Sequence, residues 1–127
     1  MAGHLKILKS EDKKRLFLSP SLTAEELKGY MSAFVDEVES KGTDNSWTNS
    51  NYGMSKLGVI AMTRALAVRE PGMRINCYCP GYCDTDMTSH KGPRSPAQGA
   101  ETGVMLATIG KDGPTGKFYS NGVEAEW

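Results

Sequence analysis

The side chains with the clearest chemical potential are Tyr52 and Lys56, which lie four positions apart in the sequence. On a helix this spacing places both side chains on one face, about one turn apart. An ammonium group close to a phenol favours the phenolate and lowers the pKa of the phenol from its ordinary value of about 10. A tyrosine tuned in this way can donate a proton to a carbonyl oxygen, or accept one from an alcohol, near neutral pH. The same spacing occurs on ordinary solvated helices, so the pair alone does not establish a site.

The helix that must position this pair is predicted over residues 52–70. Asn49, Ser50 and Asn51 can each cap its amino end, and Pro71-Gly72 stops it. Apolar side chains occupy nearly every side, namely Leu57, Val59, Ile60, Ala61, Met62, Ala65, Leu66, Ala67 and Val68. A helix with this pattern is expected to be buried all round. Because a Tyr–Lys pair at the entry of a buried helix is better placed to be a site than one on a surface, we favour the functional interpretation.

Composition limits the classes of function. The chain has 127 residues, enough for one domain, and its acidic and basic residues number 15 each. Because the charges balance, the composition does not indicate binding to nucleic acid or to an anionic membrane. No apolar run approaches the ~20 residues of a membrane span, and Met1–His4 do not begin a signal peptide. Three cysteines, an odd number, indicate reduced thiols and a cytoplasmic protein.

Upstream of the Tyr52 helix, residues 1–22 are expected to be irregular, with room for a short helix over residues 11–16. Thr23-Ala24-Glu25-Glu26 forms a capping box, and an amphipathic helix is predicted from there to residue 41. Its apolar stripe is Leu27, Tyr30, Met31, Phe34, Val35 and Val38. We expect this stripe to pack in the core, with partner binding as the less favoured alternative. Residues 42–50 are predicted to form a loop.

A short strand is predicted over residues 74–79, directly after the turn that ends the Tyr52 helix. A long apolar helix, a tight turn and a strand form the αβ half of a βαβ unit. In open α/β sheets, ligands bind just beyond the carboxyl ends of the strands. The segment from Pro80 to Asp86 lies there, where Gly81 allows close backbone approach and Thr85 offers a hydroxyl.

The remaining elements are predicted from local signals. Residues 88–95 are polar and rich in Gly and Pro, which indicates a mobile loop. Ser95 is the expected cap of a helix that runs to about Ile109. Residues 110–114 have turn chemistry, and a last strand is predicted over residues 117–120.

Two other patterns were considered as sites. Cys77, Cys79 and Cys83 form C-x-C-x3-C, but there is no paired C-x-x-C, and buried reduced cysteines commonly behave as small hydrophobic residues. We therefore expect no metal site. Gly113–Lys117 lacks the full spacing of a phosphate loop and precedes a strand instead of a helix, so that interpretation is discarded.

Taken in order, Tyr-x-x-x-Lys at the head of an apolar helix, a short strand and Pro-Gly-x-x-x-Thr resemble the short-chain dehydrogenase/reductase family. The segments Cys79–Met87 and Ser95–Thr102, the extra capped helix and the Trp-terminated tail resemble its carbonyl reductase branch. The resemblance runs over essentially all of the chain. It implies an α/β fold: the carboxyl-terminal half of a Rossmann-type doubly wound parallel sheet, helix-rich, with an extra helix before the Tyr-x-x-x-Lys helix.

The resemblance also implies roles for five residues. Tyr52 would be the general acid that protonates a carbonyl as hydride arrives, and Lys56 would lower the pKa of Tyr52 and hold the nicotinamide ribose. Pro80, Gly81 and Thr85 would line the nicotinamide end of NADP(H), with Thr85 hydrogen-bonding near the carboxamide or the phosphates. The implied activity is NADPH-dependent reduction of aldehydes, ketones or quinones to alcohols.

The chain departs from the family pattern at its amino-terminal side. The glycine-rich turn Gly-x-x-x-Gly-x-Gly, which holds the pyrophosphate, occurs nowhere in the sequence. The family's catalytic Asn is also absent, and its catalytic Ser would fall just upstream of Met1. We therefore expect residues 1–127 to be the carboxyl-terminal catalytic and substrate half of one reductase domain, lacking the nucleotide-binding half. On that account NADP(H) binding is incomplete and the chain alone is inactive.

Two questions about assembly follow from the resemblance. Since the stripe from Leu27 to Val38 could cover the Tyr52 helix within one chain, we expect the full-length enzyme to be a monomer, whereas the fragment could self-associate. The alternative is a non-catalytic truncated protein that binds a partner, or oligomerises, through exposed apolar helix faces. A third reading, a small metal-binding domain, would be settled by metal analysis.

Overall fold

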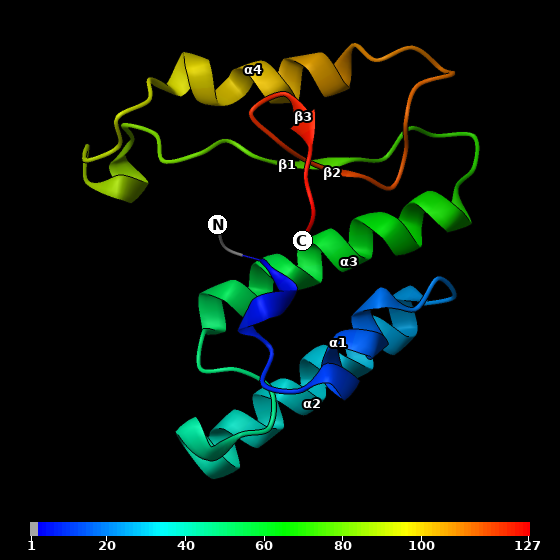
Figure 1. Cartoon of the computed structure of the whole chain (residues 1–127), viewed down its shortest axis with the longest axis vertical. Coiled ribbons are helices and arrows are strands. Elements are labelled where there is room, and N and C mark those ends of the chain that lie inside the picture. The colour runs from blue at the N-terminus through cyan, green and yellow to red at the C-terminus, as the bar shows by residue number, and fades with distance from the viewer. Residues whose placement is uncertain (1–2) are drawn as a thin grey trace.

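The computed structural model describes residues 3–127, and its elements stack in layers. Figure 1 shows α4 on one face of a small sheet and α3 on the other, with α1 and α2 beyond α3. The helices are α1 (Glu11–Leu18), α2 (Ala24–Lys41), α3 (Asn51–Arg69) and α4 (Pro96–Ala107), with short 3-10 helices at Leu5–Ile7, Gly42–Asp44 and Asp86–Thr88. The strands are β1 (Cys77–Cys79), β2 (Phe118–Ser120) and β3 (Val123–Glu124). This helix-rich α/β arrangement confirms the predicted fold class.

The sheet has the order β1-β2-β3. β1 and β2 are parallel, with Cys77 opposite Phe118, and α4 lies in the connection between them, as a parallel pair requires. β2 and β3 form an antiparallel hairpin through Asn121 and Gly122, which have φ angles of 52° and 76°. Two consecutive residues with positive φ are typical of the tight turns that close hairpins. The sequence predicts β2 but not β3, which is only two residues long.

β1 is shorter than the strand predicted over residues 74–79. The backbone N–H of Ile75 donates to Thr115 Oγ1 at 3.0 Å, and Asn76 Nδ2 donates to the carbonyl oxygen of Pro114 at 2.9 Å. Ile75 also accepts a backbone hydrogen bond from Gly116 N–H at 2.7 Å, but regular strand pairing starts only at Cys77.

α2 packs on α3 as its apolar stripe predicts. Its capping box is present, because Thr23 Oγ1 accepts from the backbone N–H of Glu26 at 3.1 Å and the Glu26 carboxylate accepts from that of Thr23 at 2.9 Å. Leu27 and Phe34 are buried in one core cluster with Leu57 of α3. The core-packing role expected for this helix is confirmed, except that Val35 of the predicted stripe is 49% exposed.

α3 is buried on several sides but not all round, which corrects the sequence-based expectation. Met54 and Leu57 are fully buried, whereas Tyr52, Val59 and Val68 are 60%, 54% and 72% exposed. These three side chains are exposed because no part of the chain that the structure describes covers them. The apolar composition of the helix therefore overstates its burial in residues 3–127.

The amino-terminal segment is part of the core. It contains α1 where the sequence allowed a short helix over residues 11–16, but the rest of the segment is not irregular as predicted. Leu8, Phe17 and Leu22 are buried in the same cluster as α2 and α3, and Ser10 caps α1 by accepting from the backbone N–H of Lys13 at 3.2 Å. These side chains fill space between the two long helices, a tertiary effect that local patterns do not reveal. Residues 1 and 2 lie outside the described part of the chain.

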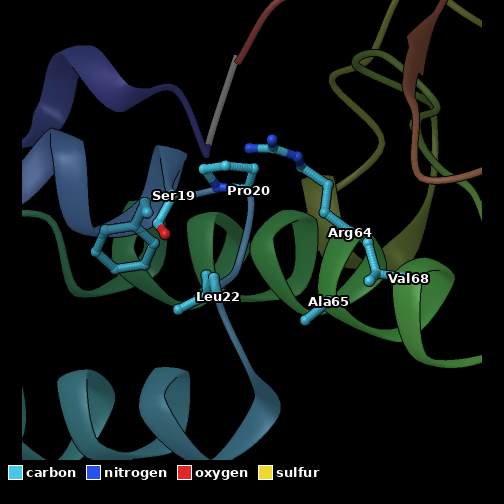
Figure 2. A pocket seen from close by; sticks show the side chains of 7 residues that line it. Ser19, Pro20, Leu22, Arg64, Ala65 and Val68 are labelled. Atoms are coloured by element: carbon cyan, nitrogen blue, oxygen red, sulfur yellow. The ribbon is translucent and has the colours of Figure 1, made fainter.

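A small cavity marks where this segment meets α3. Figure 2 shows Ser19, Pro20 and Leu22 on one side of it and Arg64, Ala65 and Val68 of α3 on the other. Its volume of about 30 Å³ suits a water molecule or two and is far too small for a substrate.

α4 begins at the predicted cap. Ser95 Oγ accepts from the backbone N–H of Gln98 at 3.2 Å, and Gln98 Oε1 accepts from that of Ser95 at 2.9 Å. The helix ends at Ala107, two residues before the predicted end. Within residues 3–127, no helix combines the length and the apolar character needed to cross a membrane.

Candidate active site

Tyr52 and Lys56 lie in the first two turns of α3, whose amino end is fixed by Ser50. Ser50 Oγ accepts a hydrogen bond from the backbone N–H of Gly53 at 2.9 Å. Lys56 Nζ lies over the Tyr52 ring, 5.3 Å from its centroid, which is within cation–π range. The structure therefore brings the pair together as its spacing predicts, and because Tyr52 is 60% exposed the ring is accessible to a ligand.

The loop that leads into α3 is organised by Asn45, a buried polar residue that the sequence analysis missed. Asn45 Oδ1 accepts from the backbone N–H groups of Trp47 and Thr48, both at 2.9 Å. Its Nδ2 donates to the carbonyl oxygen of Gly42 at 2.8 Å. Asn side chains commonly bind nearby backbone in turns, so the residue type was a signal, although a weak one. Asn45 holds the chain in the shape from which α3 starts.

Lys9 fixes the same loop from the amino-terminal segment. Its Nζ donates to the carbonyl oxygens of Thr43 and Asn45, both at 2.7 Å, and its backbone N–H donates to that of Trp47 at 2.8 Å. The two Nζ contacts span 34 and 36 sequence positions. Because these partners are distant in sequence, no local pattern could have identified Lys9. Through these contacts Lys9 helps to position α3, the proposed catalytic helix.

The loop after β1 presents the other three predicted site residues. Pro80 and Gly81 are exposed, and Gly81 has a φ of 81°, a conformation that favours glycine. Thr85 is half-buried, and its hydroxyl has a weak contact of 3.4 Å with Thr88 Oγ1. Thr88 Oγ1 in turn accepts from the backbone N–H of Thr85 at 3.1 Å. The structure thus leaves an open backbone surface at Pro80-Gly81 with one hydroxyl nearby.

Two glycines allow this loop to pack tightly. A Cβ at Gly92 would lie 2.1 Å from the carbonyl carbon of Cys83, and a Cβ at Gly99 would lie 2.4 Å from Cys83 Sγ. Cys83 is buried between them, with its thiol directed at the carbonyl oxygen of Pro80 at 3.4 Å. Neither glycine was identified from the sequence, since the requirement comes from contacts between separate segments.

Residues 88–95 are held by several contacts, so the prediction of a mobile loop is not supported by the structure. His90 Nδ1 lies 2.7 Å from Asp84 Oδ1, and its Nε2 lies 3.0 Å from Asp86 Oδ1. The backbone N–H of His90 donates to the carbonyl oxygen of Thr85 at 3.0 Å. The polar side chains on which the prediction of mobility was based form hydrogen bonds instead.

The two groups of site residues lie on the same side of the molecule. In Figure 1 the amino end of α3 and the segment that follows β1 are both at the left of the view. A hollow of about 240 Å³ is lined by a different set, namely Arg74, Asn76, Tyr78, Gly103, Leu106 and Ala107. None of the five predicted residues lines this hollow or the small cavity of Figure 2.

The cysteines are free thiols among the described residues. Burial raises the pKa of the Cys77 thiol, and a hydrogen bond with Thr63 of α3 opposes this effect. Within residues 3–127, no three His, Cys, Asp or Glu side chains converge in a way that could hold a metal ion.

Comparisons with known proteins agree with this geometry. A family model described as short chain dehydrogenase matches residues 35–95. Carbonyl reductase [NADPH] 1 of Rattus norvegicus is 37% identical over 93% of this chain and 46% of its own length. (+)-Neomenthol dehydrogenase of Capsicum annuum is 39% identical over 78% of this chain and 32% of its own length.

Among solved structures, salutaridine reductase from Papaver somniferum matches with a TM-score of 0.83 and 30% identity, covering 92% of this chain and 41% of its own. This chain therefore spans less than half the length of the relatives it matches. The neighbours confirm that its layers form part of a Rossmann-type α/β fold. On the matching motifs, relatives and fold, the chain belongs to the short-chain dehydrogenase/reductase family, in which it is similar to the carbonyl reductases.

Proposed function

We propose that this chain is the carboxyl-terminal, catalytic half of an NADPH-dependent reductase that converts aldehydes, ketones or quinones to alcohols. The observation that carries the proposal is the Tyr52–Lys56 pair at the exposed head of α3, on the same side of the molecule as the loop after β1. The similarity to carbonyl reductase [NADPH] 1 supports the cofactor and the class of substrate.

In the proposed reaction Tyr52 donates its phenolic proton to the carbonyl oxygen of the substrate while the carbonyl carbon gains a hydride. The product is an alcohol, and Tyr52 is left as a phenolate that solvent reprotonates. Lys56 Nζ, 5.3 Å from the centroid of the Tyr52 ring, places a cation beside the proposed proton donor. NADPH, when bound, supplies the hydride.

The residues present fit the nicotinamide end of such a cofactor. Pro80 and Gly81 are exposed, so their backbone is open to a ligand on the side that Arg94 does not cover. Thr85 offers a half-buried hydroxyl that lies 3.4 Å from Thr88 Oγ1. We assign Pro80, Gly81 and Thr85 to the nicotinamide end, and Lys56 and Tyr52 to the adjoining ribose.

The pyrophosphate needs a second half-domain. No glycine-rich turn of the family type occurs in the sequence. Among the described residues β1 pairs only with β2, so its other edge is open to a further strand, and the exposed side chains of α3 lack a cover. We therefore infer that residues 1–127 form one half of a single Rossmann domain, inactive without the nucleotide-binding half.

The remaining features of the whole protein are inferred in the same way. The packing of α2 on α3 supports a monomeric full-length enzyme, because it occupies a face of α3 within one chain. The free thiols of Cys77, Cys79 and Cys83 favour a reducing compartment, and we place the enzyme in the cytoplasm.

The test replaces Tyr52 and Lys56 in a protein that joins this chain to the nucleotide-binding half of rat carbonyl reductase. Tyr52→Phe is expected to lower kcat for quinone reduction at least about 100-fold, the usual effect of a general acid. NADPH binding, followed by fluorescence, should weaken but persist in this variant, because Lys56 would still hold the ribose. Lys56→Met is expected to lower kcat and also to weaken NADPH binding. Unchanged kcat in Tyr52→Phe would refute the proposed role.

A second candidate function is a non-catalytic interaction protein. The observation that favours it is the exposure of Val59 and Val68, at 54% and 72%, on a long helix of the isolated chain. The intact mass of the natural protein, detected through a peptide spanning Ser50–Lys56, separates the two candidates. A mass near twice 13.8 kDa favours the reductase, and a mass near 13.8 kDa favours the interaction protein.

A further inference from the structure

Arg94 connects three segments around the loop that follows β1. Its Nη1 donates to Asn121 Oδ1 in the β2–β3 turn, and its Nη2 donates to the carbonyl oxygen of Gln98 in α4 at 3.0 Å. Its backbone is tied to the same loop, because Asp84 N–H donates to the Arg94 carbonyl at 2.8 Å and Arg94 N–H donates to that of Tyr82 at 3.3 Å. Arg94 thus attaches the loop to α4 and to the hairpin at once.

The Arg94 side chain also packs closely against Gly81. A Cβ at Gly81 would lie 2.9 Å from Arg94 Cδ and 3.3 Å from its Nε. Because the backbone of Gly81 rests this closely on the arginine stem, the course of the loop from Pro80 to Thr85 depends on where that stem lies.

One atom of Arg94 lowers the stability of this arrangement. The Nε–H is buried and has no hydrogen-bond partner within residues 3–127. A buried donor without an acceptor destabilises a fold. A lysine would avoid this penalty, but a single ammonium on a flexible stem does not reproduce the planar fork that reaches both Asn121 and Gln98. An arginine therefore suits this position, because its planar guanidinium can bind Asn121 and Gln98 at the same time.

We propose that Arg94 is the positioning residue for the nicotinamide end of the cofactor site. It touches neither cofactor nor substrate and acts through Pro80, Gly81 and Thr85, which it holds against α4 and the β2–β3 turn. This inference rests on the proposed function for its cofactor, but its structural part can be measured without one.

The first experiment measures the reactivity of Cys83 in the full 127-residue chain. Cys83 is 7% exposed beneath the loop, so release of the loop should expose its thiol. Arg94→Ala is expected to speed modification of Cys83 by a thiol reagent at least about tenfold, the effect of losing charge-assisted hydrogen bonds, with Arg94→Lys in between. Lys91→Ala, which removes a cation from the same exposed segment, is the matched control and should leave the rate unchanged. Equal rates in Arg94→Ala and wild type would overturn the inference.

A milder variant covers the case in which Arg94→Ala does not fold. Asn121→Gly removes only the Oδ1 acceptor, and its backbone φ of 52° suits glycine. This variant should speed modification of Cys83 less than Arg94→Ala but more than Lys91→Ala. If Asn121→Gly behaves like Lys91→Ala, the inference that Arg94 holds the loop through the β2–β3 turn is overturned.

The second experiment uses the chain joined to a nucleotide-binding half. Arg94→Ala should raise KM for NADPH about tenfold, leave KM for the quinone unchanged, and be partly rescued by Arg94→Lys. A loss of thermal stability with no change in KM for NADPH would overturn the positioning role. If the wild-type joined protein does not bind NADPH, the proposed function fails, whereas the Cys83 rates still decide whether Arg94 holds the loop.

Discussion

Glu37 joins the end of α2 to the loop that leads into the proposed catalytic helix. Its carboxylate accepts from Ser46 Oγ at 2.7 Å, from Lys41 Nζ at 2.9 Å and from the Ser46 backbone N–H at 3.0 Å. These contacts lower the pKa of Glu37 from 4.5 to about 2. The Ser46 hydroxyl has the largest effect, followed by Lys41 and the Ser46 backbone N–H. The ionised form therefore stabilises the folded chain above pH 4.5, and this contribution is lost as the pH falls towards 2.

Ser46→Ala should therefore raise the pKa of Glu37 and lower the free energy of unfolding at pH 7. The difference from wild type should shrink as the pH falls through 2 and vanish only below it, where Glu37 is protonated in both proteins. Urea unfolding at several pH values measures this. Ser40→Ala, which removes a hydroxyl bonded only to helix carbonyls, is the control. A difference that is the same at pH 2 and pH 7 would contradict the assignment.

Cys77 gives a second prediction for a single residue. Because burial raises the pKa of its thiol, less of it is thiolate at a given pH, and alkylation by iodoacetamide should need a higher pH than in the unfolded chain. Thr63→Val should slow alkylation further, since the hydrogen bond with Thr63 opposes the effect of burial. Mass spectrometry of the Cys77 peptide, with urea-unfolded protein as reference, measures both rates. Faster alkylation in the folded chain would contradict the prediction.

The sequence predicted some of the site residues and missed others for a physical reason. Tyr52 and Lys56 share one helix face, so their spacing revealed the pair. Lys9 and Arg94 act through partners as far as 36 and 27 positions away, and such contacts leave no periodic pattern. The catalytic roles assigned to Tyr52, Lys56, Pro80, Gly81 and Thr85 stay predictions until the variants are measured.

Among the elements, α1 is the one whose contribution to the core was not foreseen. Phe17 is fully buried against the α2–α3 pair, whereas its neighbour Leu18 is 46% exposed. Phe17→Ala should therefore lower the free energy of unfolding by about 3–5 kcal/mol. Leu18→Ala, the matched control, should change it by less than about 0.5 kcal/mol. Equal losses in urea unfolding would show that α1 is not part of the core.

Helix caps could be predicted because they depend on residues within one turn. Thr23, Ser50 and Ser95 each begin a helix where the sequence indicates. Which side chains of α3 are exposed could not be predicted in the same way, because their burial depends on contacts with segments outside the helix. β3 was missed since a two-residue strand is defined by its pairing with β2 and has no periodicity of its own.

At the scale of the whole molecule, the structure is compatible with the proposed half-domain. α4 and α3 cover opposite faces of a sheet in which β1 pairs on one edge only among the described residues (Figure 1). The chain spans 46% of rat carbonyl reductase, and the family's phosphate-binding turn is not in its sequence. The α/β class was predictable from the order of helix and strand signals, whereas the open edge and the uncovered side of α3 became visible only in three dimensions.

The central claim is that this chain supplies the acid catalyst and needs a second half for the hydride donor. The most direct test follows NADPH oxidation with a quinone, using the purified 127-residue chain alone and the same chain joined to the nucleotide-binding half of rat carbonyl reductase. We predict no turnover by the chain alone, and turnover by the joined protein that depends on Tyr52. Turnover by the isolated chain, or turnover by the joined protein that is unchanged in Tyr52→Phe, would contradict the claim.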